Sequence, residues 1–302
     1  MVAVKDDKGT ITKWISTATE IQSQKKQKEE LEDTVLKRTY ELQQLNKTLH
    51  GKNSELQKMN KELETFAYIS SHDLQEPLRK IQTFTSWMLE REYVSLSEKG
   101  KDYFNRIQDA ALRMQTLIQD LLSYSRTDNM EKKFVIKDLS KVLEQVRADL
   151  QEVFDEKEAA LDAKDLGEAR IIPFQFHQMM YNLIANSLKF SIPGKPLHII
   201  VKSEVASGGE LQKTNDRLEA GRLSPEKNYV HISISDNGIG FEPQYADRIF
   251  ELFQRLYSKE EYQGTGIGLA IARRIVENHS GFITATGAPN HGATFDIYLP
   301  DF

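Results

Sequence analysis

Apolar residues recur at helical spacing from Ile21 to Met88, in a highly charged stretch that contains one proline, Pro77. Up to Ser70 they also keep a seven-residue register with two apolar seam positions, which polar residues interrupt at four places. This register predicts a parallel coiled coil over residues 21–61, most simply in a homodimer, and the interruptions leave a solvated linker helix as the alternative. The apolar seam residues are Ile21, Val35, Leu42, Leu49, Leu56 and Leu63 in one position and Leu31, Leu45, Met59 and Phe66 in the other; the interruptions are Gln24, Lys28, Arg38 and Lys52.

The first 15 residues alternate between apolar and polar side chains around an Asp-Asp-Lys-Gly turn. Alternation of this kind, with glycine in the turn, is typical of a β-hairpin. Two strands alone are only marginally stable. We therefore treat residues 1–20 as a short segment separate from the helix that follows.

Two amphipathic helices are predicted within residues 62–128, the second with Ser97 as its N-cap. A short loop between them makes an αα-hairpin, and pairing two copies in a homodimer would bury both apolar stripes in a four-helix bundle. Residues 127–133 read as a linker. The stripes are Phe66, Ile69, Leu74, Leu78, Ile81, Phe84 and Met88, then Tyr103, Phe104, Ile107, Ala111, Met114, Leu117, Ile118, Leu121 and Leu122.

Residues 129–302 mix both kinds of periodicity, which predicts an α+β layer domain. A polar, glycine-containing segment, 206–228, is expected to be an excursion between two strands. The expected strands are 134–136, 197–201, 229–235, 281–285 and 293–299, and the expected helices are 139–158, 174–190 and 266–279.

Composition narrows the possible functions. The 302 residues include no cysteine, which excludes disulfides, thiolate catalysis and cysteine-type zinc sites. A net charge of −5 gives no general reason to bind nucleic acid or an anionic membrane, so any polyanion must be held locally. Because no long apolar run and no basic, apolar leader is visible, we expect a cytoplasmic chain without a membrane segment.

The helix expected over 174–190 carries polar residues on one face. Asn182, Asn186 and Lys189 fall within roughly 60° of each other, opposite an apolar side. An ordinary solvated face is the simplest explanation, but asparagine is a poor helix former, and two of them four residues apart weaken it. A neutral amide oxygen suits Mg²⁺ that also carries phosphate oxygens, and Lys189 adds a positive charge.

Two glycine clusters follow. In the first, Asp236-Asn-Gly238-Ile-Gly240 ends an expected strand, and it is either a hairpin turn or a site where Asp236 accepts a hydrogen bond from an exocyclic amine such as that of adenine. In the second, Gly264-Thr-Gly266-Ile-Gly268 opens a helix, which suits phosphate, although a simple hinge is the alternative. It lacks the lysine of a Walker loop and the spacing of a dinucleotide fingerprint. Between the clusters, Phe250 and Phe253 are placed to pack a mobile lid, and Arg255 to reach phosphate.

In this order, these elements resemble the N, G1, F and G2 boxes of the histidine kinase family, whose ATP-binding domain shares the Bergerat fold with gyrase and Hsp90. The resemblance spans roughly residues 62–302. It implies that Asn186 binds Mg²⁺, that Asn182 and Lys189 assist, that Asp236 reads adenine and that residues 241–263 form a lid. Ser187 stands where the family commonly has alanine. The other nucleotide-binding positions implied are Gly238, Gly240, Phe250, Phe253, Arg255, Gly264, Thr265, Gly266, Gly268 and Leu269.

The segment Ser-His-Asp-Leu-Gln-Glu-Pro-Leu, residues 71–78, resembles the phosphoacceptor box of the same family. Independently, His72 lies roughly 160° around the helix from the centre of the apolar stripe, so it should face out of the bundle. The resemblance implies that His72 is the nucleophile. The carboxylate of Asp73 would accept the proton of the second ring nitrogen, and Pro77 should bend the helix beside it.

Glu76 departs from the family pattern. Members that also dephosphorylate their partner usually carry threonine or asparagine four residues after the histidine, to position water. A carboxylate there would repel an incoming aspartyl phosphate, so we do not expect phosphatase activity.

The sequence Leu-Gln-Glu-Pro-Leu-Arg in this box resembles that of the phytochrome-like branch of the family. Residues 1–20, with Trp14, resemble the last strands of a PAS sensor domain. A full PAS domain needs about 100 residues. The input signal is therefore not identified by this sequence, and light sensing is not implied.

The sequence thus predicts an α+β multidomain chain: a long coiled-coil helix over 21–61, a dimeric four-helix bundle of αα-hairpins over 62–128, and a Bergerat-type α/β sandwich over 129–302. The implied function is a homodimeric sensor histidine kinase that uses ATP and Mg²⁺, phosphorylates His72 and passes the phosphoryl group to an aspartate of a response-regulator receiver domain. Two alternatives remain: a gyrase- or Hsp90-like ATPase that needs no His72, and a coiled-coil interaction protein with a degenerate nucleotide domain.

Overall fold

The protein divides into two compact units, residues 1–63 and 64–302. The computed structural model describes residues 2–15, 18–93, 95–126, 133–214, 218, 222–257, 262 and 264–301. Within these, the side chains of 12–23, 56, 57, 60–70, 72, 125, 126 and 214 lie outside the description.

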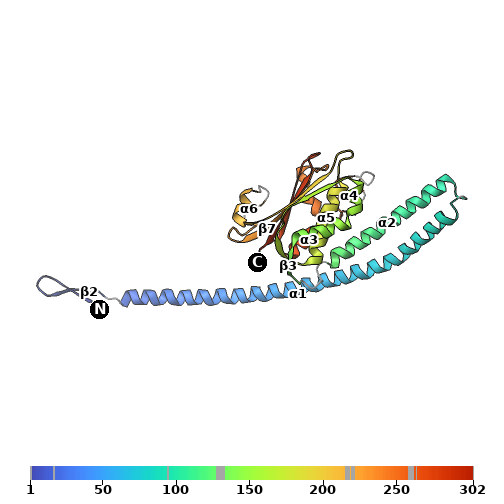
Figure 1. The fold of residues 1–302 in the computed structure, drawn as a ribbon. Coiled ribbons are helices and arrows are strands. Elements are labelled where there is room, and N and C mark those ends of the chain that lie inside the picture. The colour runs from blue at the N-terminus through green and yellow to red at the C-terminus, as the bar shows by residue number, and fades with distance from the viewer. Residues whose placement is uncertain are drawn as a thin grey trace. The chain divides into compact units, whose positions relative to one another are not determined.

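The first unit begins with the predicted hairpin, in which β1 (Val2–Lys5) pairs antiparallel with β2 (Ile11–Ile15; Figure 1). The carboxylate of Asp6 fixes the turn, because its Oδ1 accepts the backbone N–H groups of Lys8 and Thr10 at 3.0 and 2.9 Å. Membership of a PAS-like domain stays a prediction.

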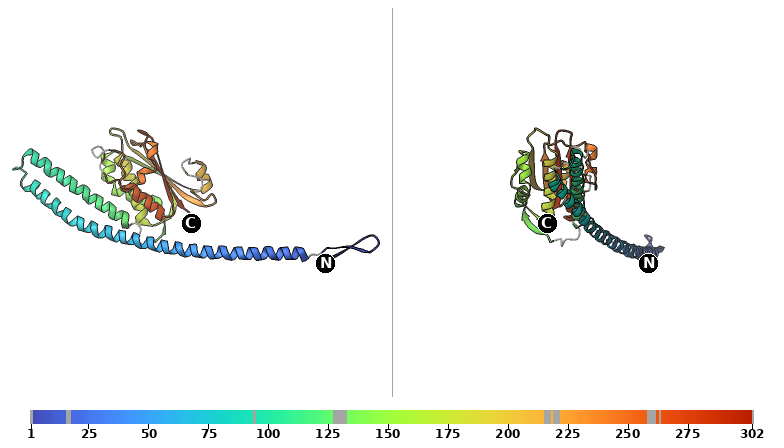
Figure 2. Two further views of the ribbon diagram at one scale, coloured as in Figure 1. Left: turned by 180° about the vertical axis from the view of Figure 1, so that it is seen from behind. Right: turned by 90° about the vertical axis from the view of Figure 1, so that its right-hand side faces the viewer.

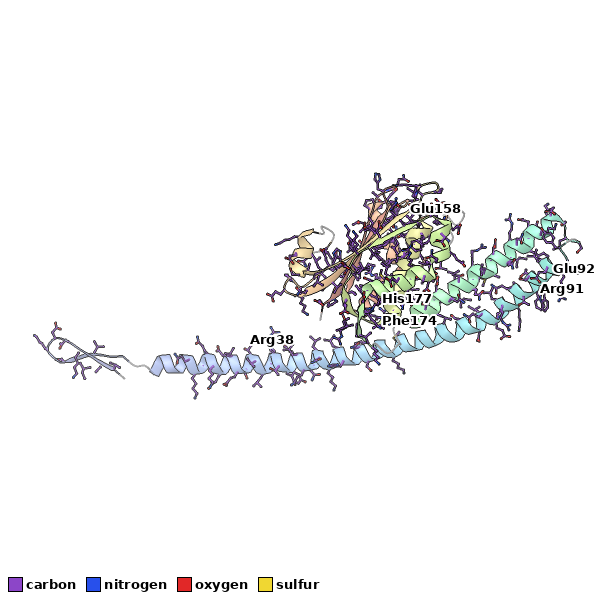
Figure 3. All side chains as sticks on the ribbon, viewed as in Figure 1. Arg38, Arg91, Glu92, Glu158, Phe174 and His177 are labelled. Atoms are coloured by element: carbon purple, nitrogen blue, oxygen red, sulfur yellow. The ribbon has the colours of Figure 1, made fainter. Side chains whose placement is uncertain are left out.

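From Ala18 the chain forms one helix, α1 (Ala18–Arg91). The described side chains of the predicted coiled-coil seam, such as Leu42 and Leu49, are exposed in the single chain. Arg38, one of the polar interruptions, lies on α1 (Figure 3). It forms an ion pair with Glu41 at 3.0 Å on the same helix. These seam residues are free to pair with a second chain, but the coiled coil itself stays a prediction.

The second unit opens with the predicted αα-hairpin. Helix α1 runs through Pro77 without ending there, and α2 (Glu98–Arg126) follows after a short turn. Ser97 is the N-cap, since its Oγ accepts the N–H of Gly100 at 3.1 Å. The two helices pack through buried Leu78, Ala111 and Ile118.

Much of the apolar stripe of this hairpin remains uncovered in one chain. Exposed residues include Phe84, Ile107 and Met114. Both helices are amphipathic, and among the described residues none of the helices combines the length and apolar content that crossing a bilayer requires. The exposed stripe is the one expected to pair across a dimer.

A five-stranded sheet in the order β4-β6-β7-β9-β8 forms one layer of the remaining domain (Figures 1 and 2). Only β4 and β6 run parallel; the other neighbours are antiparallel. In the central strands, Ile232 lies opposite Ser203 on one side and Ile297 on the other. The strands are β4 (Ala160–Ala163), β6 (His198–Ser207), β7 (Asn228–Asp236), β8 (Phe282–Gly287) and β9 (Ala293–Pro300).

Helices cover one face of this sheet, and their apolar sides form the main core with it (Figure 2). Met179 and Leu183 from α5 and Ile232 and Ile297 from the sheet are almost completely buried. An antiparallel pair, β3 with β5, packs beside them. The helices are α3 (Leu139–Asp149), α4 (Gln151–Glu156), α5 (Pro173–Lys189) and α7 (Gly268–Asn278), with the short 3-10 turns η1 (Pro243–Tyr245) and η2 (Arg248–Phe250). The strand pair consists of β3 (Val135–Asp138) and β5 (Glu168–Ile171).

This architecture confirms the predicted α+β class and differs from the prediction in detail. The helix expected over 139–158 divides at Leu150 into α3 and α4. The short strands β4 and β5 were not predicted. Within the expected polar excursion, α6 (Gly208–Thr214) forms because Leu211 packs on Tyr229 and Tyr298 of the sheet. Residues 127–132 of the expected linker lie outside the described residues.

Candidate functional site

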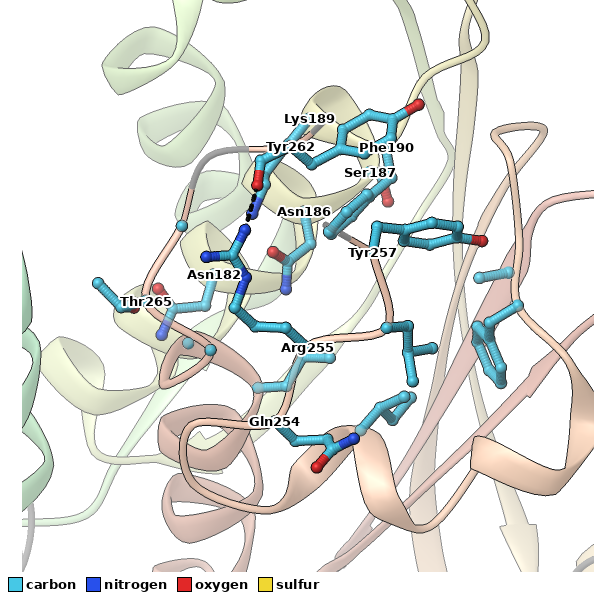
Figure 4. A pocket seen from close by; sticks show the side chains of 18 of the residues that line it. Asn182, Asn186, Ser187, Lys189, Phe190, Gln254, Arg255, Tyr257, Tyr262 and Thr265 are labelled. Atoms are coloured by element: carbon cyan, nitrogen blue, oxygen red, sulfur yellow. Dashed lines mark hydrogen bonds between the residues drawn. The ribbon is translucent and has the colours of Figure 1, made fainter. Parts of the chain in front are cut away.

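A cavity of about 280 Å³ in the second unit is lined by α5, the end of β7 and the segment that leads into α7 (Figure 4). These elements come from distant parts of the chain. The cavity nevertheless brings together most of the residues singled out in the sequence: Asn182, Asn186, Lys189, Asp236, Gly240, Arg255, Gly264, Thr265, Gly266, Gly268 and Leu269.

The polar face of α5 forms one wall. Asn182 and Asn186, one helical turn apart, line the cavity, while Leu183 and Ile184 on the other side are fully buried in the core. The amide Nδ2 of Asn182 is buried and has no hydrogen-bond partner among the described residues. A buried unsatisfied donor is costly, so this wall is suited to a polar ligand.

Asp236 lies at the end of β7 with its carboxylate held on both oxygens. Oδ1 accepts the N–H groups of Gly238 at 2.9 Å and Ala293 at 3.2 Å, and Oδ2 accepts the hydroxyl of Ser187 at 2.9 Å. Burial raises the pKa of Asp236, and these three hydrogen bonds act in the opposite direction. The arrangement orients a hydrogen-bond acceptor in the cavity wall.

The glycine-rich turn forms the wall at the N-terminus of α7. Gly266 has a φ of +74°, and a Cβ there would lie 2.8 Å from the carbonyl oxygen of Gln254. Only glycine combines this backbone conformation with so close an approach. The turn therefore brings backbone groups and the positive end of α7 to the cavity, as phosphate binding requires.

Two cationic side chains line the same cavity. Lys189 lies against the glycine-rich turn, because a Cβ at Gly264 would be 2.3 Å from its Nζ. Arg255 donates to the carbonyl oxygen of Tyr262 at 2.6 Å (Figure 4). Burial lowers the pKa of Lys189, and repulsion by Arg255 lowers it further. An anion between the two would favour the charged form of Lys189.

An aromatic group that the sequence analysis did not single out closes another side. The rings of Phe190, Tyr257 and Tyr262 lie with their centroids 5.1 to 6.0 Å apart. The hydroxyl of Tyr257 donates to the carbonyl oxygen of Gly240 at 2.8 Å. The two tyrosines belong to the expected lid over 241–263, but nothing in the local sequence marks them as partners of Phe190.

Helix α2 also reaches the cavity, through Thr116 and Asp120. The hydroxyl of Thr265 donates to Oδ2 of Asp120 at 2.5 Å, and burial raises the pKa of this carboxyl while the hydrogen bond lowers it. Nearby, Gln178 donates to the hydroxyl of Ser123. Sequence reasoning placed no site residue on α2, because the contact joins positions 145 residues apart.

Three predicted residues do not line the cavity among the residues described: Gly238, Phe250 and Phe253. Phe250 is buried in the core, edge-on to Phe295. Phe253 is 58% exposed. Gly238 acts indirectly, because its N–H holds Asp236. Direct nucleotide contacts by these three stay predictions.

The candidate phosphoacceptor segment lies on α1. The backbone of His72 is helical, but its side chain lies outside the described residues. Asp73 is exposed, and Glu76 forms an ion pair with Lys80 at 2.8 Å on the surface of the helix. The roles of His72 and Asp73 therefore stay predictions.

Two family models match the chain. The model for "Histidine kinase-, DNA gyrase B-, and HSP90-like ATPase" matches residues 172–302, which contain the cavity residues of α5, β7 and α7. The model for "His Kinase A (phospho-acceptor) domain" matches residues 62–129, the helical hairpin.

Individual proteins are similar to both regions together. Phytochrome-like protein Cph1 of Synechocystis sp. is 32% identical over 281 residues, which is 93% of this chain and 34% of that protein, so the chain spans about a third of the length of this relative. The crystal structure of full-length ShkA in complex with AMPPNP has a TM-score of 0.56 at 21% identity, and the match covers 78% of this chain and 45% of that one. The structure of histidine kinase ThkA in complex with response regulator protein TrrA has a TM-score of 0.50 at 18% identity, covering 80% and 64%. At these identities the two structures support the fold alone.

The pair of cations predicts how the cavity should distinguish charged from neutral ligands. We expect Lys189→Met to weaken ATP binding by about tenfold and to leave adenosine binding unchanged, because a charge-assisted hydrogen bond to phosphate is lost. Isothermal titration calorimetry with both ligands measures this, with Lys195→Met, an exposed lysine in the loop after α5, as the control. Equal losses for ATP and adenosine would show that Lys189 supports the cavity without contacting phosphate.

Proposed function

Because the chain belongs to the histidine kinase family, with a phosphoacceptor hairpin followed by an ATPase-type domain, we propose that it transfers the γ-phosphoryl group of ATP to His72 and then to a response regulator. The observation that carries this proposal is the cavity in which Asn186, Asp236 and the glycine-rich turn meet. A nucleotide site on the same chain as a proposed phosphoacceptor segment supports kinase chemistry more strongly than either feature would by itself.

The cavity divides naturally between the two ends of a nucleotide. At one end, Asp236 supplies an acceptor for the exocyclic amine of adenine. At the other end, Lys189 and the glycine-rich turn supply positive charge for phosphates.

Mg²⁺ fits the phosphate end. The amide oxygen of Asn186 is a hard, neutral ligand, and Mg²⁺ commonly binds through one or two protein oxygens together with substrate phosphates and water. We propose that Asn186 holds the ion, with Asn182 beside it. When bound, Mg²⁺ would offset the charge of the transferring phosphoryl group.

In the transfer, a ring nitrogen of His72 forms a bond to the γ-phosphorus while the bond from that phosphorus to the bridging oxygen of ATP breaks, which leaves ADP. The carboxylate of Asp73 accepts the proton of the other ring nitrogen and so keeps the imidazole lone pair available. Pro77 has no N–H to donate to the carbonyl of Asp73, which loosens the helix next to the acceptor.

The acting species is proposed to be a homodimer. Phe84 and Ile107, on the two helices of the hairpin, expose 59% and 45% of their surface in the single chain. Pairing two hairpins would remove this stripe from water. The receiver of the phosphoryl group is proposed to be an aspartate of a response regulator, as expected for a protein similar to ThkA, whose structure contains the regulator TrrA.

The identity of the nucleophile can be tested with γ-labelled ATP and Mg²⁺. We expect acid-labile label on the protein that disappears in His72→Gln, because glutamine offers no nucleophilic ring nitrogen. His50→Gln, a change at an exposed histidine on the same helix, should be labelled like the wild type. Phosphate release without labelled protein would indicate an ATPase of the gyrase or Hsp90 kind, and no turnover would indicate an interaction protein.

The metal assignment has its own test. Asn186→Ala should abolish labelling and remove the Mg²⁺ dependence of ATP binding, while sedimentation shows an intact dimer, because the change affects only the cavity wall. Asn46→Ala, at an exposed helical asparagine of α1, is the control. Normal labelling of the Asn186 variant would contradict its role as a ligand.

Phosphatase activity is proposed to be weak because of Glu76. Its carboxylate would repel an aspartyl phosphate, although the ion pair with Lys80 reduces its field. We expect Glu76→Thr to increase the rate at which a phosphorylated receiver domain loses phosphate, by about tenfold or more if the hydroxyl positions water. Glu90→Thr, further along the same helix, serves as the control. An unchanged rate in Glu76→Thr would show that Glu76 is not what limits dephosphorylation.

A further inference from the structure

Ser187 has an unusual place in the site. It follows Asn186 on α5, is only 2% exposed and lines the cavity, yet it is neither a phosphate nor a metal ligand in the proposed function. Its hydroxyl contacts the carboxylate of Asp236, 49 residues further along the chain. This contact joins the helix that carries the asparagines to the strand that carries the acceptor.

The proton of this hydroxyl is committed to Asp236. The distance from Oγ to Oδ2 of Asp236 is 2.9 Å, whereas the other acceptor within reach, the carbonyl oxygen of Leu183, is at 3.4 Å. A hydroxyl has one proton to donate, and a hydrogen bond to an ionised carboxylate is stronger than one to a neutral carbonyl. Ser187 therefore acts as a donor to Asp236.

The hydrogen bonds of Asp236 are divided between its two oxygens. Oδ1 accepts two backbone N–H groups, from Gly238 and Ala293. Oδ2 accepts only Ser187 among the hydrogen bonds described, which leaves it acceptor capacity on the cavity side. Within the described part of the chain, Ser187 is thus the one side chain whose hydrogen bond orients the oxygen available to a ligand.

The ionisation of Asp236 decides which ligand this oxygen can accept. An ionised carboxylate only accepts hydrogen bonds, so it binds an amine and repels a carbonyl oxygen; a protonated carboxyl can donate to that carbonyl. Burial favours the neutral form by raising the pKa of Asp236, and the hydrogen bond from Ser187 favours the ionised form. Among the residues that the structure describes, the other titratable ones that line the cavity are Asp120, Lys189, Arg255, Tyr257 and Tyr262.

We propose that Ser187 is a positioning residue that holds Asp236 as a pure hydrogen-bond acceptor, and thereby makes the site selective for 6-aminopurine nucleotides over 6-oxopurine nucleotides. The proposal rests on the proposed ATP-binding function and adds the residue that determines base selectivity. No bond is made or broken by Ser187 itself.

The direction of the pH dependence follows. Affinity for ATP is present while Asp236 is ionised and is lost as the pH falls through its pKa. Removing the hydrogen bond from Ser187 moves that pKa upward, so the variant should lose affinity for ATP, and selectivity, at a higher pH than the wild type. At alkaline pH the wild type and the variant should show the same affinity for ATP and the same selectivity.

The test compares ATP with inosine triphosphate, which carries oxygen in place of the 6-amine. Dissociation constants of both nucleotides are measured by calorimetry from mildly acidic to alkaline pH for the wild type, Ser187→Ala and Ser187→Thr. We expect the ATP preference of Ser187→Ala to fall by about tenfold at the acidic end, in line with one hydrogen bond to a charged group. Ser187→Thr, which keeps a hydroxyl, should restore the wild-type profile.

Ser235→Ala is the matched control, because it removes a similar hydroxyl contact, 2.9 Å to Thr294, one residue before Asp236 but outside the cavity lining. It should leave the selectivity profile unchanged. A Ser187→Ala variant with the wild-type preference at every pH, or one that loses both nucleotides equally, would overturn the proposal. Binding is measured without phosphoryl transfer, so a protein that binds ATP but does not label His72 would contradict the proposed function and leave this test valid.

Discussion

The site depends on one constraint, that helix α5 must be apolar on one side and polar on the other. Leu183 and Ile184 anchor the helix in the core, and this burial sets the rotation that turns Asn182 and Asn186 toward the cavity. A helix turns by about 100° per residue, so apolar and polar positions cannot be exchanged independently. The hydrophobic core therefore positions the polar chemistry, and the remaining site residues are arranged around this helix.

Electrostatics make the cavity suited to an anionic ligand. Lys189 and Arg255 line one space in which their mutual repulsion and burial disfavour two positive charges. Asp236, which lines the same cavity, is half-buried and accepts hydrogen bonds from three donors. The polyanionic tail of a ligand would offset the repulsion between Lys189 and Arg255. An amine on the same ligand would donate a hydrogen bond to Asp236. This division of charge, rather than any single residue, favours a nucleotide.

The contact between Asp120 and Thr265 links the helical hairpin to the glycine-rich turn. It places a second carboxylate, beside that of Asp236, in the wall of a cavity that Lys189 and Arg255 also line. The same hairpin carries the candidate phosphoacceptor segment, so this hydrogen bond joins the hairpin to the nucleotide-binding candidate site within one unit. The exposed apolar stripe of the hairpin is a separate feature, and its chemistry is suited to a second copy of the chain.

The sequence by itself determined those features that depend on residues close together along the chain. The periodicity of α1, α2, α5 and α7, the N-cap at Ser97, the asparagine pair and the glycine-rich turn could all be predicted, because each depends on residues within a few positions of one another. The short strands β4 and β5 and the helix α6 were missed because pairing and packing with distant segments stabilise them more than their own residues do.

Only the tertiary structure decided how these signals combine. The bond from Ser187 to Asp236 spans 49 residues, and that from Thr265 to Asp120 spans 145, so neither leaves a pattern along the chain. The same holds for the aromatic group that joins Phe190 to Tyr257 and Tyr262. Composition and spacing specify which chemical groups a segment can offer; which groups share one buried space is set by the packing of the sheet and its helices, since that alone brings distant residues within hydrogen-bond reach.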